Sequence, residues 1–147
     1  MTEEEKKNEI MAYLEKLRWP KKIRCPYTEG ICYGTKIPFT YVCKDTKKKF
    51  NVLTRTHIAN YKSSLVLWDL LVLMLVQGRT EGDTANALGI SDNTRMKMYK
   101  KIFFAMHLLK PSRDYLLHEA LIRKLKERRA SKDYVFKKLL ERDENII

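Results

Sequence analysis

The sequence predicts an α+β protein that is mostly α, and three observations support this. Helix-favouring residues dominate segment 3–17 and the chain from Ser63 to its end. Between these parts, residues 21–56 alternate short β-prone pieces with turn residues. Apolar residues make up 44% of the 147 residues, which is enough to bury a core. The expected order is an N-terminal helix, a small antiparallel β unit, a three-helix unit and a C-terminal helical pair.

The first helix is expected over residues 3–17. Its apolar side chains recur at helical spacing and form one face: Ile10, Tyr13, Leu14 and Leu17. Acidic residues in the first turn suit the positive end of the helix dipole, and Pro20 stops the helix from continuing.

The β unit is expected to have about three strands. Phe39, Tyr41 and Cys43 alternate with Thr40 and Val42, which is the period of a strand. The segment "KDTKKKF" (44–50) predicts a basic hairpin tip that leads into a last strand. So small a unit buries little surface alone, and we expect other elements to support it.

Capping residues and stops divide the chain after residue 62 into helices. Ser63 or Ser64 can cap a first helix that runs to about residue 77, and Thr80 can cap a second that ends at Leu88. A third helix is expected from about Asp92 to about Leu109, with these residues inside: Met98, Tyr99, Ile102, Ala105, Met106 and Leu109.

Two amphipathic helices are expected at the C-terminal end, capped by Ser112 and Ser131. Their apolar residues are Leu116, Leu117, Ala120, Leu121, Leu125, Val135, Phe136, Leu139 and Leu140. This apolar stripe could close over the core or form a homodimer. The expected domain boundaries are therefore 1–62 for the first helix and β unit, 63–110 for the three helices, and 111–147 for the C-terminal pair.

The segment "EGDTANALGISDNTRMKMYKKI" (81–102) has the pattern of a helix-turn-helix. Ala85 supplies the small residue where two helices cross, and Leu88 comes just before the turn. Gly89 permits the positive φ of a sharp turn, Ile90 can fill the space beneath it, and Ser91 can cap the next helix. The spacing predicts a second helix with one buried face and one polar face.

That polar face predicts a helix that reads the major groove of DNA. Asn93 and Arg95 have side chains suited to adenine and guanine edges, whereas Lys97, Lys100 and Lys101 suit phosphates. The alternative is an ordinary helical hairpin with a solvated basic face.

The net charge of +12 favours a polyanionic partner, most often nucleic acid. Residues 18–62 hold eleven Lys and Arg against Glu29 and Asp45, a net of +9. We expect four lysines of the hairpin to contact backbone phosphates: Lys44, Lys47, Lys48 and Lys49. The alternative is a soluble protein that is merely rich in lysine.

The three cysteines do not form a disulfide framework, because their number is odd. Cys25, which Pro26 follows, and Cys43 have the spacing of two zinc-ribbon ligands, but Thr28 and Thr46 occupy the other two ligand positions. Structural zinc requires four N or S donors. We therefore expect no metal and treat Cys25 and Cys43 as residual ligand positions, with Cys32 as the residue that could retain a weak site.

Three stretches together resemble the N-terminal region of insertion-sequence transposases that carry a zinc ribbon. They are "YLEKLRWPKKIRCP" (13–26), "YVCKDTKKKFNVLTRTHIANYKSSLVLW" (41–68) and "ALGISDNTRMKMYKKIFFAM" (87–106). The resemblance spans roughly residues 10–108. It implies a degenerate zinc ribbon followed by a DNA-binding helix-turn-helix. We expect the catalytic domain of that family to be absent, because it needs well over a hundred residues and only 38 follow Leu109 here.

The sequence contains no enzyme motif of the P-loop, HExxH or GxSxG type, and we expect neither catalysis nor a cofactor. The longest apolar run, residues 65–76, contains Asp69 and is too short for a membrane span. The N-terminal residues lack the pattern of a signal peptide, so a cytoplasmic location is expected, at the nucleoid if the protein binds DNA.

The function that these features predict is sequence-specific binding of double-stranded DNA by a non-enzymatic, transposase-derived regulator, which could serve a host, a virus or a mobile element. Two alternatives remain open. The scaffold could bind a host protein instead, for example as an inhibitor of a defence system. The chain could also be a truncated transposase fragment, which predicts a poorly folded segment after Leu109.

Overall fold

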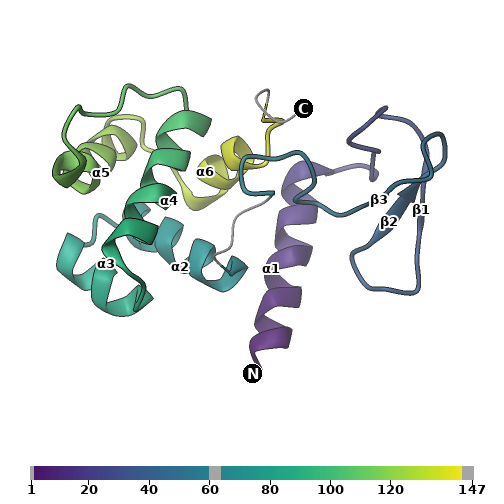
Figure 1. Ribbon diagram of the computed structural model, residues 1–147, viewed down its shortest axis with the longest axis horizontal. Coiled ribbons are helices and arrows are strands. Elements are labelled where there is room, and N and C mark those ends of the chain that lie inside the picture. The colour runs from purple at the N-terminus through teal and green to yellow at the C-terminus, as the bar shows by residue number, and fades with distance from the viewer. Residues whose placement is uncertain (1, 60–63, 144–147) are drawn as a thin grey trace. The chain divides into compact units, whose positions relative to one another are not determined.

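The computed structural model describes residues 2–59 and 64–143 and confirms an α+β fold that is mostly helical (Figure 1). Its elements are α1 (Glu3–Arg18), β1 (Cys32–Gly34), β2 (Tyr41–Cys43), β3 (Lys49–Phe50), α2 (Leu65–Val76), α3 (Glu81–Leu88), α4 (Asp92–Ala105), the 3-10 helix η1 (Asp114–Leu116), α5 (Leu117–Glu127) and α6 (Lys132–Leu139). The chain divides into two compact units. Unit 1 comprises Met1–Asn60 and Leu140–Ile147, and unit 2 comprises Tyr61–Leu139.

Unit 1 begins with α1, which Thr2 caps by accepting a hydrogen bond from the Glu5 N–H at 3.1 Å. The helix ends at Arg18, just before Pro20 as the sequence predicts. The three strands form an antiparallel sheet in the order β1-β2-β3. Phe39 differs from the prediction, because it lies in the turn before β2 at φ 61° and so cannot continue the strand.

The sheet is held to α1 by an aromatic cluster. The ring centroids of Trp19, Tyr41 and Phe50 lie 5.7 to 6.1 Å apart, and Phe50 is only 3% exposed. The Tyr41 hydroxyl also donates a hydrogen bond to Glu15 Oε2 at 2.6 Å, while Arg18 donates to carbonyl oxygens of the loop after β3. These contacts supply the support that three strands of two or three residues lack on their own.

The end of the chain returns to unit 1, where the sequence predicted a separate C-terminal domain. Arg142 forms an isolated antiparallel bridge with Thr56, and the Asp143 N–H donates to the carbonyl oxygen of Arg55 at 3.0 Å. The carboxylate of Asp143 lies 3.9 Å from Nδ1 of His57, and both side chains are buried. Sequence periodicity could not predict this pairing, because it joins segments about 85 residues apart through backbone groups.

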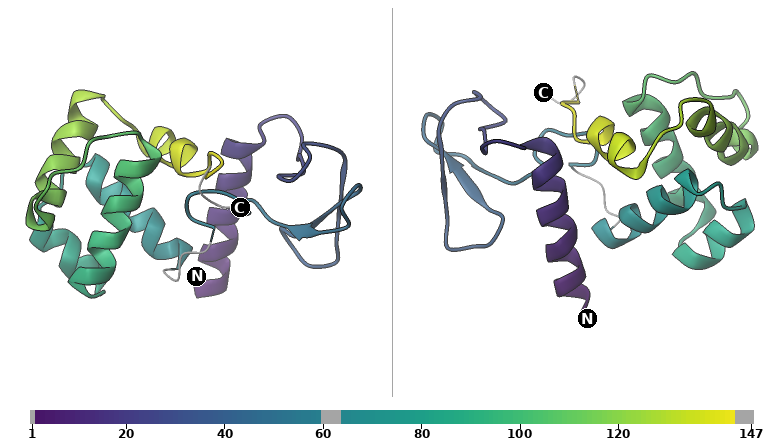
Figure 2. Two further views of the ribbon diagram at one scale, coloured as in Figure 1. Left: turned by 45° about the horizontal axis from the view of Figure 1, so that its top comes forward. Right: turned by 180° about the vertical axis from the view of Figure 1, so that it is seen from behind.

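Unit 2 is built around α2, whose apolar run is buried as predicted. Ser64 caps α2 at the Leu67 N–H, and Gly78 follows it with φ 72°. Trp68 and Leu71 are almost fully buried. Helix α2 contacts α3, α5 and α6, and α4 contacts α5 and α6 (Figure 2). The segments predicted as domains 63–110 and 111–147 therefore share one core up to Leu139.

Helix α4 is shorter than the sequence predicts. It ends at Ala105 because His107 adopts a left-handed conformation at φ 56°, where Leu108 N–H donates back to the carbonyl oxygen of Phe103. Leu109 is therefore outside the helix and 90% exposed, whereas we expected it in the core.

The C-terminal helices pack within unit 2. Helix η1 precedes α5, and no side chain caps either of them, so the predicted cap at Ser112 is wrong. Leu116 is 40% exposed, which corrects its predicted inward position. The remaining stripe is buried at Leu117, Leu121, Leu125, Val135, Phe136 and Leu139. The stripe therefore closes over the core of its own unit.

Candidate nucleic-acid interface

The turn between α3 and α4 has the conformation expected of a helix-turn-helix. Thr80 caps α3 by accepting a hydrogen bond from the Asp83 N–H at 3.1 Å. Gly89 lies in the left-handed region at φ 61°, which its missing Cβ permits. Ser91 then caps α4 through the Thr94 N–H at 3.2 Å. Gly89 ends α3 and Ser91 begins α4, so the short turn between them sets which face of α4 points to solvent.

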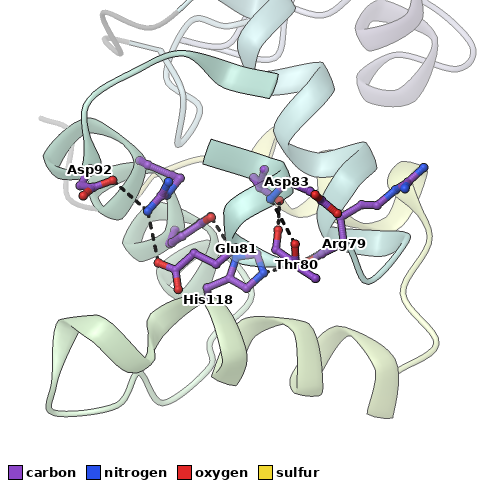
Figure 3. Close-up of polar contacts among 9 residues, drawn as sticks. Arg79, Thr80, Glu81, Asp83, Asp92 and His118 are labelled. Carbon is purple, nitrogen blue, oxygen red and sulfur yellow. Dashed lines mark hydrogen bonds and ion pairs between the residues drawn. The ribbon is translucent and has the colours of Figure 1, made fainter. Parts of the chain in front are cut away.

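A buried histidine joins α4 and α5 to the residue before this motif. His118 is 1% exposed, its Nδ1 lies 2.9 Å from the Tyr99 hydroxyl, and its Nε2 lies 2.9 Å from the carbonyl oxygen of Arg79. Because a carbonyl oxygen can only accept, Nε2 carries the proton in that hydrogen bond. Figure 3 shows His118 beside Thr80 and Glu81 at the start of α3. The arrangement gives His118 a structural role.

Arg95 does not lie on the solvent face of α4. Its side chain is 3% exposed, and Nη2 is 3.2 Å from Glu81 Oε1 and 3.0 Å from Asp92 Oδ1. The guanidinium also lies 6.0 Å from the centroid of the Tyr99 ring. A side chain so enclosed cannot reach a guanine edge, so this structure does not support the base contact predicted for Arg95. Its role is to hold the start of α4 against the start of α3.

The Arg95 ion pairs give a first prediction about stability. We expect the double variant Glu81→Gln/Asp92→Asn to lower the free energy of unfolding of unit 2 by about 1–2 kcal/mol, because it leaves a buried cation without a counter-charge. The loss is smaller than for a fully buried pair because the Asp92 side chain is 85% exposed. The fluorescence of the buried Trp68 during denaturant unfolding measures this loss. Adding Arg95→Met should restore most of the stability, since the buried charge is then gone. A double variant as stable as the wild type would contradict this role for Arg95.

The exposed face of α4 contains the other residues predicted to bind DNA. Asn93 and Lys97 are exposed. Lys100 is half-buried and its Nζ lies 3.0 Å from Asp114 Oδ2, so part of its charge is compensated within the protein. Lys101 Nζ lies 5.9 Å from the centroid of the Phe104 ring. The structure thus brings four of the five predicted residues of α4 to one face.

An open groove of about 540 Å³ lies at the C-terminal end of this face. Lys97, Lys100, Lys101 and Lys110 line it together with apolar residues. Phe104 and Leu109 contribute exposed apolar surface, at 49% and 90% exposure. We did not predict this groove, because it depends on where α4 ends. The sequence did hold one signal for it, because Phe104 follows Lys101 by three residues and so lies on the polar face of α4.

Unit 1 carries the second group of predicted DNA-binding residues. Lys44, Lys47, Lys48 and Lys49 are all exposed on the β2–β3 hairpin. Lys48 Nζ lies 5.0 Å from the centroid of the Tyr27 ring, and Arg55 lies 4.8 Å from the same centroid. The aromatic ring therefore holds two cations near the first cysteine turn.

The first cysteine turn runs from Cys25 to Gly30. The Glu29 N–H donates to the carbonyl oxygen of Cys25 at 2.7 Å, and the Cys25 N–H donates to that of Gly30 at 3.3 Å. Glu29 is left-handed at φ 60°, and Thr28 Oγ1 accepts from the Gly30 N–H. The turn is thus closed by its own backbone.

The second cysteine turn repeats this geometry from Cys43 to Lys48. The Lys47 N–H donates to the carbonyl oxygen of Cys43 at 2.9 Å, and the Cys43 N–H donates to that of Lys48 at 3.0 Å. Lys47 is left-handed at φ 62°, and Thr46 Oγ1 accepts from the Lys48 N–H. The two turns are equivalent residue for residue, although only the cysteine and threonine positions share their sequence.

The donor atoms of these turns do not fit a structural zinc ion. Zinc requires four N or S donors, and threonine offers only a neutral hydroxyl. Within residues 2–59 and 64–143, no group of three or more His, Cys, Asp or Glu side chains is placed to hold a metal ion.

None of the helices in these two ranges is both long and apolar enough to cross a membrane.

Comparison with known proteins does not assign a family. No protein-family model, curated protein or solved structure matches the chain. The likeness to transposase N-terminal regions therefore stays a prediction from the sequence.

Proposed function

We propose that the protein is a non-enzymatic, sequence-specific binder of double-stranded DNA that places α4 in the major groove. The two faces of α4 carry this proposal. The inner face buries Met98 and Ile102, and the outer face exposes Asn93 and Lys97, with Lys101 half-buried beside them. A helix exposed in this way fits the width of the major groove. The capped turn supports the proposal, since it holds the outer face in a fixed orientation.

Each exposed residue has a distinct role in this proposal. Asn93 is near the N-terminal end of α4, where a recognition helix reaches base edges, and its amide can pair with adenine. Lys97, Lys100 and Lys101 bind phosphates, as do Lys44, Lys47, Lys48 and Lys49 of unit 1. With Arg95 buried, base reading depends mainly on Asn93.

We also infer that the protein shares ancestry with the N-terminal region of zinc-ribbon transposases and acts as a regulator in a virus or mobile element. The order of segments supports this inference: a helix, two equivalent cysteine turns, then a helix-turn-helix. Threonines at the two remaining ligand positions mark the difference from that family.

Salt-dependent binding tests the DNA proposal. Titration of a labelled random-sequence duplex should give a dissociation constant between nanomolar and micromolar at low salt. The logarithm of the affinity should fall linearly with the logarithm of salt, with a slope of about 0.9 per phosphate contacted. Repeated selection from random duplexes at physiological salt should then enrich one sequence motif. Absence of binding at low salt would refute the proposal.

The groove beside α4 favours a second candidate function, which is binding of a partner protein. Phe104 and Leu109 are large apolar side chains in contact with solvent, and four lysines line the same groove. A peptide with apolar and acidic side chains would match this surface. The double variant Phe104→Ser/Leu109→Ser separates the two functions, because it should abolish binding of such a peptide and retain most phosphate contacts.

A further inference from the structure

The sulfur atoms of Cys25 and Cys43 form a buried pair within unit 1. Both side chains have no exposed surface, and they share a cluster with Phe50. The two equivalent turns present their first residues to the same small space, although β1 separates them in the sequence. Cys32 is opposite Cys43 in the sheet register, but its thiol donates to the carbonyl oxygen of Ile23 at 3.5 Å.

The surroundings of this sulfur pair stabilise negative charge on sulfur. Cys25 Sγ accepts a hydrogen bond from the Tyr27 N–H at 3.4 Å, and Cys43 Sγ lies 3.6 Å from Thr28 Oγ1. Burial disfavours the thiolate of Cys43, but hydrogen bonds from Cys25, Thr46 and Thr28 outweigh it and lower the pKa of Cys43 below its usual value. The pair therefore combines burial with donors directed at sulfur.

We propose that Cys25 and Cys43 bind one Cu(I) ion between them as a two-thiolate site. Cu(I) is a soft ion that prefers thiolate ligands, and two thiolates in a near-linear arrangement satisfy it. Zn²⁺ needs four N or S donors, which the two turns do not offer. The threonines at the other two positions are hydrogen-bond partners of the Cys43 sulfur instead of metal ligands. This inference is independent of the proposed DNA binding.

The charge of the site fits this ion. Binding of Cu(I) to two thiols releases two protons and leaves a complex with one negative charge. In unit 1, residues 18–59 hold ten Lys and Arg against Glu29 and Asp45, a net of +8, and Lys48 and Arg55 lie against the Tyr27 ring next to the first turn. The nearest acidic group is Asp45, whose Oδ2 lies 3.4 Å from Thr28 Oγ1. A cationic environment stabilises an anionic complex more than the neutral complex that a divalent ion would form with the same two thiolates.

Competition with a chromophoric Cu(I) chelator under anaerobic, reducing conditions tests the proposal on the full chain. The wild type should remove one Cu(I) per chain from the complex with bicinchoninate. Cys25→Ser and Cys43→Ser should each weaken the affinity more than about 100-fold, which exceeds the loss expected from a residue that only hydrogen-bonds to a ligand. Cys32→Ser is the matched control and should bind Cu(I) as the wild type does.

X-ray absorption at the copper edge supplies a readout that does not depend on variants that fold poorly. It should find two sulfur atoms around copper in the wild type and in Cys32→Ser. Three sulfur atoms, an equal loss of affinity in Cys32→Ser, or no removal of Cu(I) from the chelator would each overturn the two-thiolate site. Titration with Zn²⁺ alone should leave the protein without stoichiometric metal, and a tight zinc complex would also contradict it.

Discussion

The double variant Lys97→Glu/Lys101→Glu is expected to lose about 100-fold of the duplex affinity at 0.1 M salt and to reduce the salt slope by about 2. Each phosphate contact contributes about 0.9 to that slope, and therefore nearly a factor of ten in affinity at this salt concentration. Both lysines are on the outer face of α4 and one turn apart. Fluorescence anisotropy of a labelled duplex over a series of salt concentrations measures both quantities.

The loss should come from binding and not from unfolding. Lys97 is exposed, and the exchange replaces one like-charged pair at i,i+4 with another, so we expect stability within about 0.5 kcal/mol of the wild type. Lys6→Glu/Lys7→Glu is the matched control, because it also lowers the formal net charge from +12 to +8 but changes exposed residues of α1. If both double variants lose affinity equally, the attraction is due to net charge and not to α4.

Two further variants distinguish a helix that recognises the base sequence from one that only binds phosphates. Asn93→Ala should leave the salt slope almost unchanged but reduce the preference for the selected sequence, because an amide–adenine contact contributes about 1–3 kcal/mol of discrimination. Arg95→Met should keep the sequence preference, since the buried guanidinium faces Glu81 and Asp92. The opposite pattern would restore Arg95 as the base-reading residue.

The local signals in the sequence predicted four helix starts correctly, because capping depends on a few adjacent residues, but they placed a cap at Ser112 that the structure does not have. Ser64, Thr80, Ser91 and Ser131 each accept a hydrogen bond from an N–H three residues later. The end of α4 was harder to predict, because the apolar pattern continues through Leu109 while the chain turns at His107. Leu109 keeps the apolar spacing of the helix although it lies beyond the helix end and lines the groove, so the spacing alone could not locate that end.

The burial of Arg95 could have been predicted from spacing. Residue 95 precedes the buried Met98, Tyr99 and Ile102 by three, four and seven positions, which places it on their face. Residue type favoured DNA contact instead, since arginine is common in recognition helices. Helical phase was the stronger constraint, and Asp92 at i−3 supplied the counter-charge. The pairing of the two cysteine turns and the return of the chain end to unit 1 are long-range contacts, which local patterns do not contain.

Phe50→Ala is expected to unfold the β part of unit 1 and leave unit 2 folded. Removal of a buried phenylalanine side chain costs about 3–5 kcal/mol. Phe50 is 3% exposed and packs against Trp19, Tyr41 and the sulfur pair, so no other side chain of the sheet can replace it. Hydrogen exchange followed by mass spectrometry should show rapid exchange in peptides of residues 19–59 and unchanged protection in α2 to α5.

The matched control for this variant is Phe39→Ala, which removes the same ring from a partly exposed turn position of the same unit. Its expected cost is below about 1 kcal/mol, as for most substitutions outside a core. Loss of protection in both units of Phe50→Ala would contradict the expectation that they fold independently.

If the units fold independently, DNA binding by this variant also measures how much of the affinity each unit contributes. Loss of the hairpin lysines should reduce the salt slope, while the sequence preference that Asn93 confers should persist because α3 and α4 keep their fold.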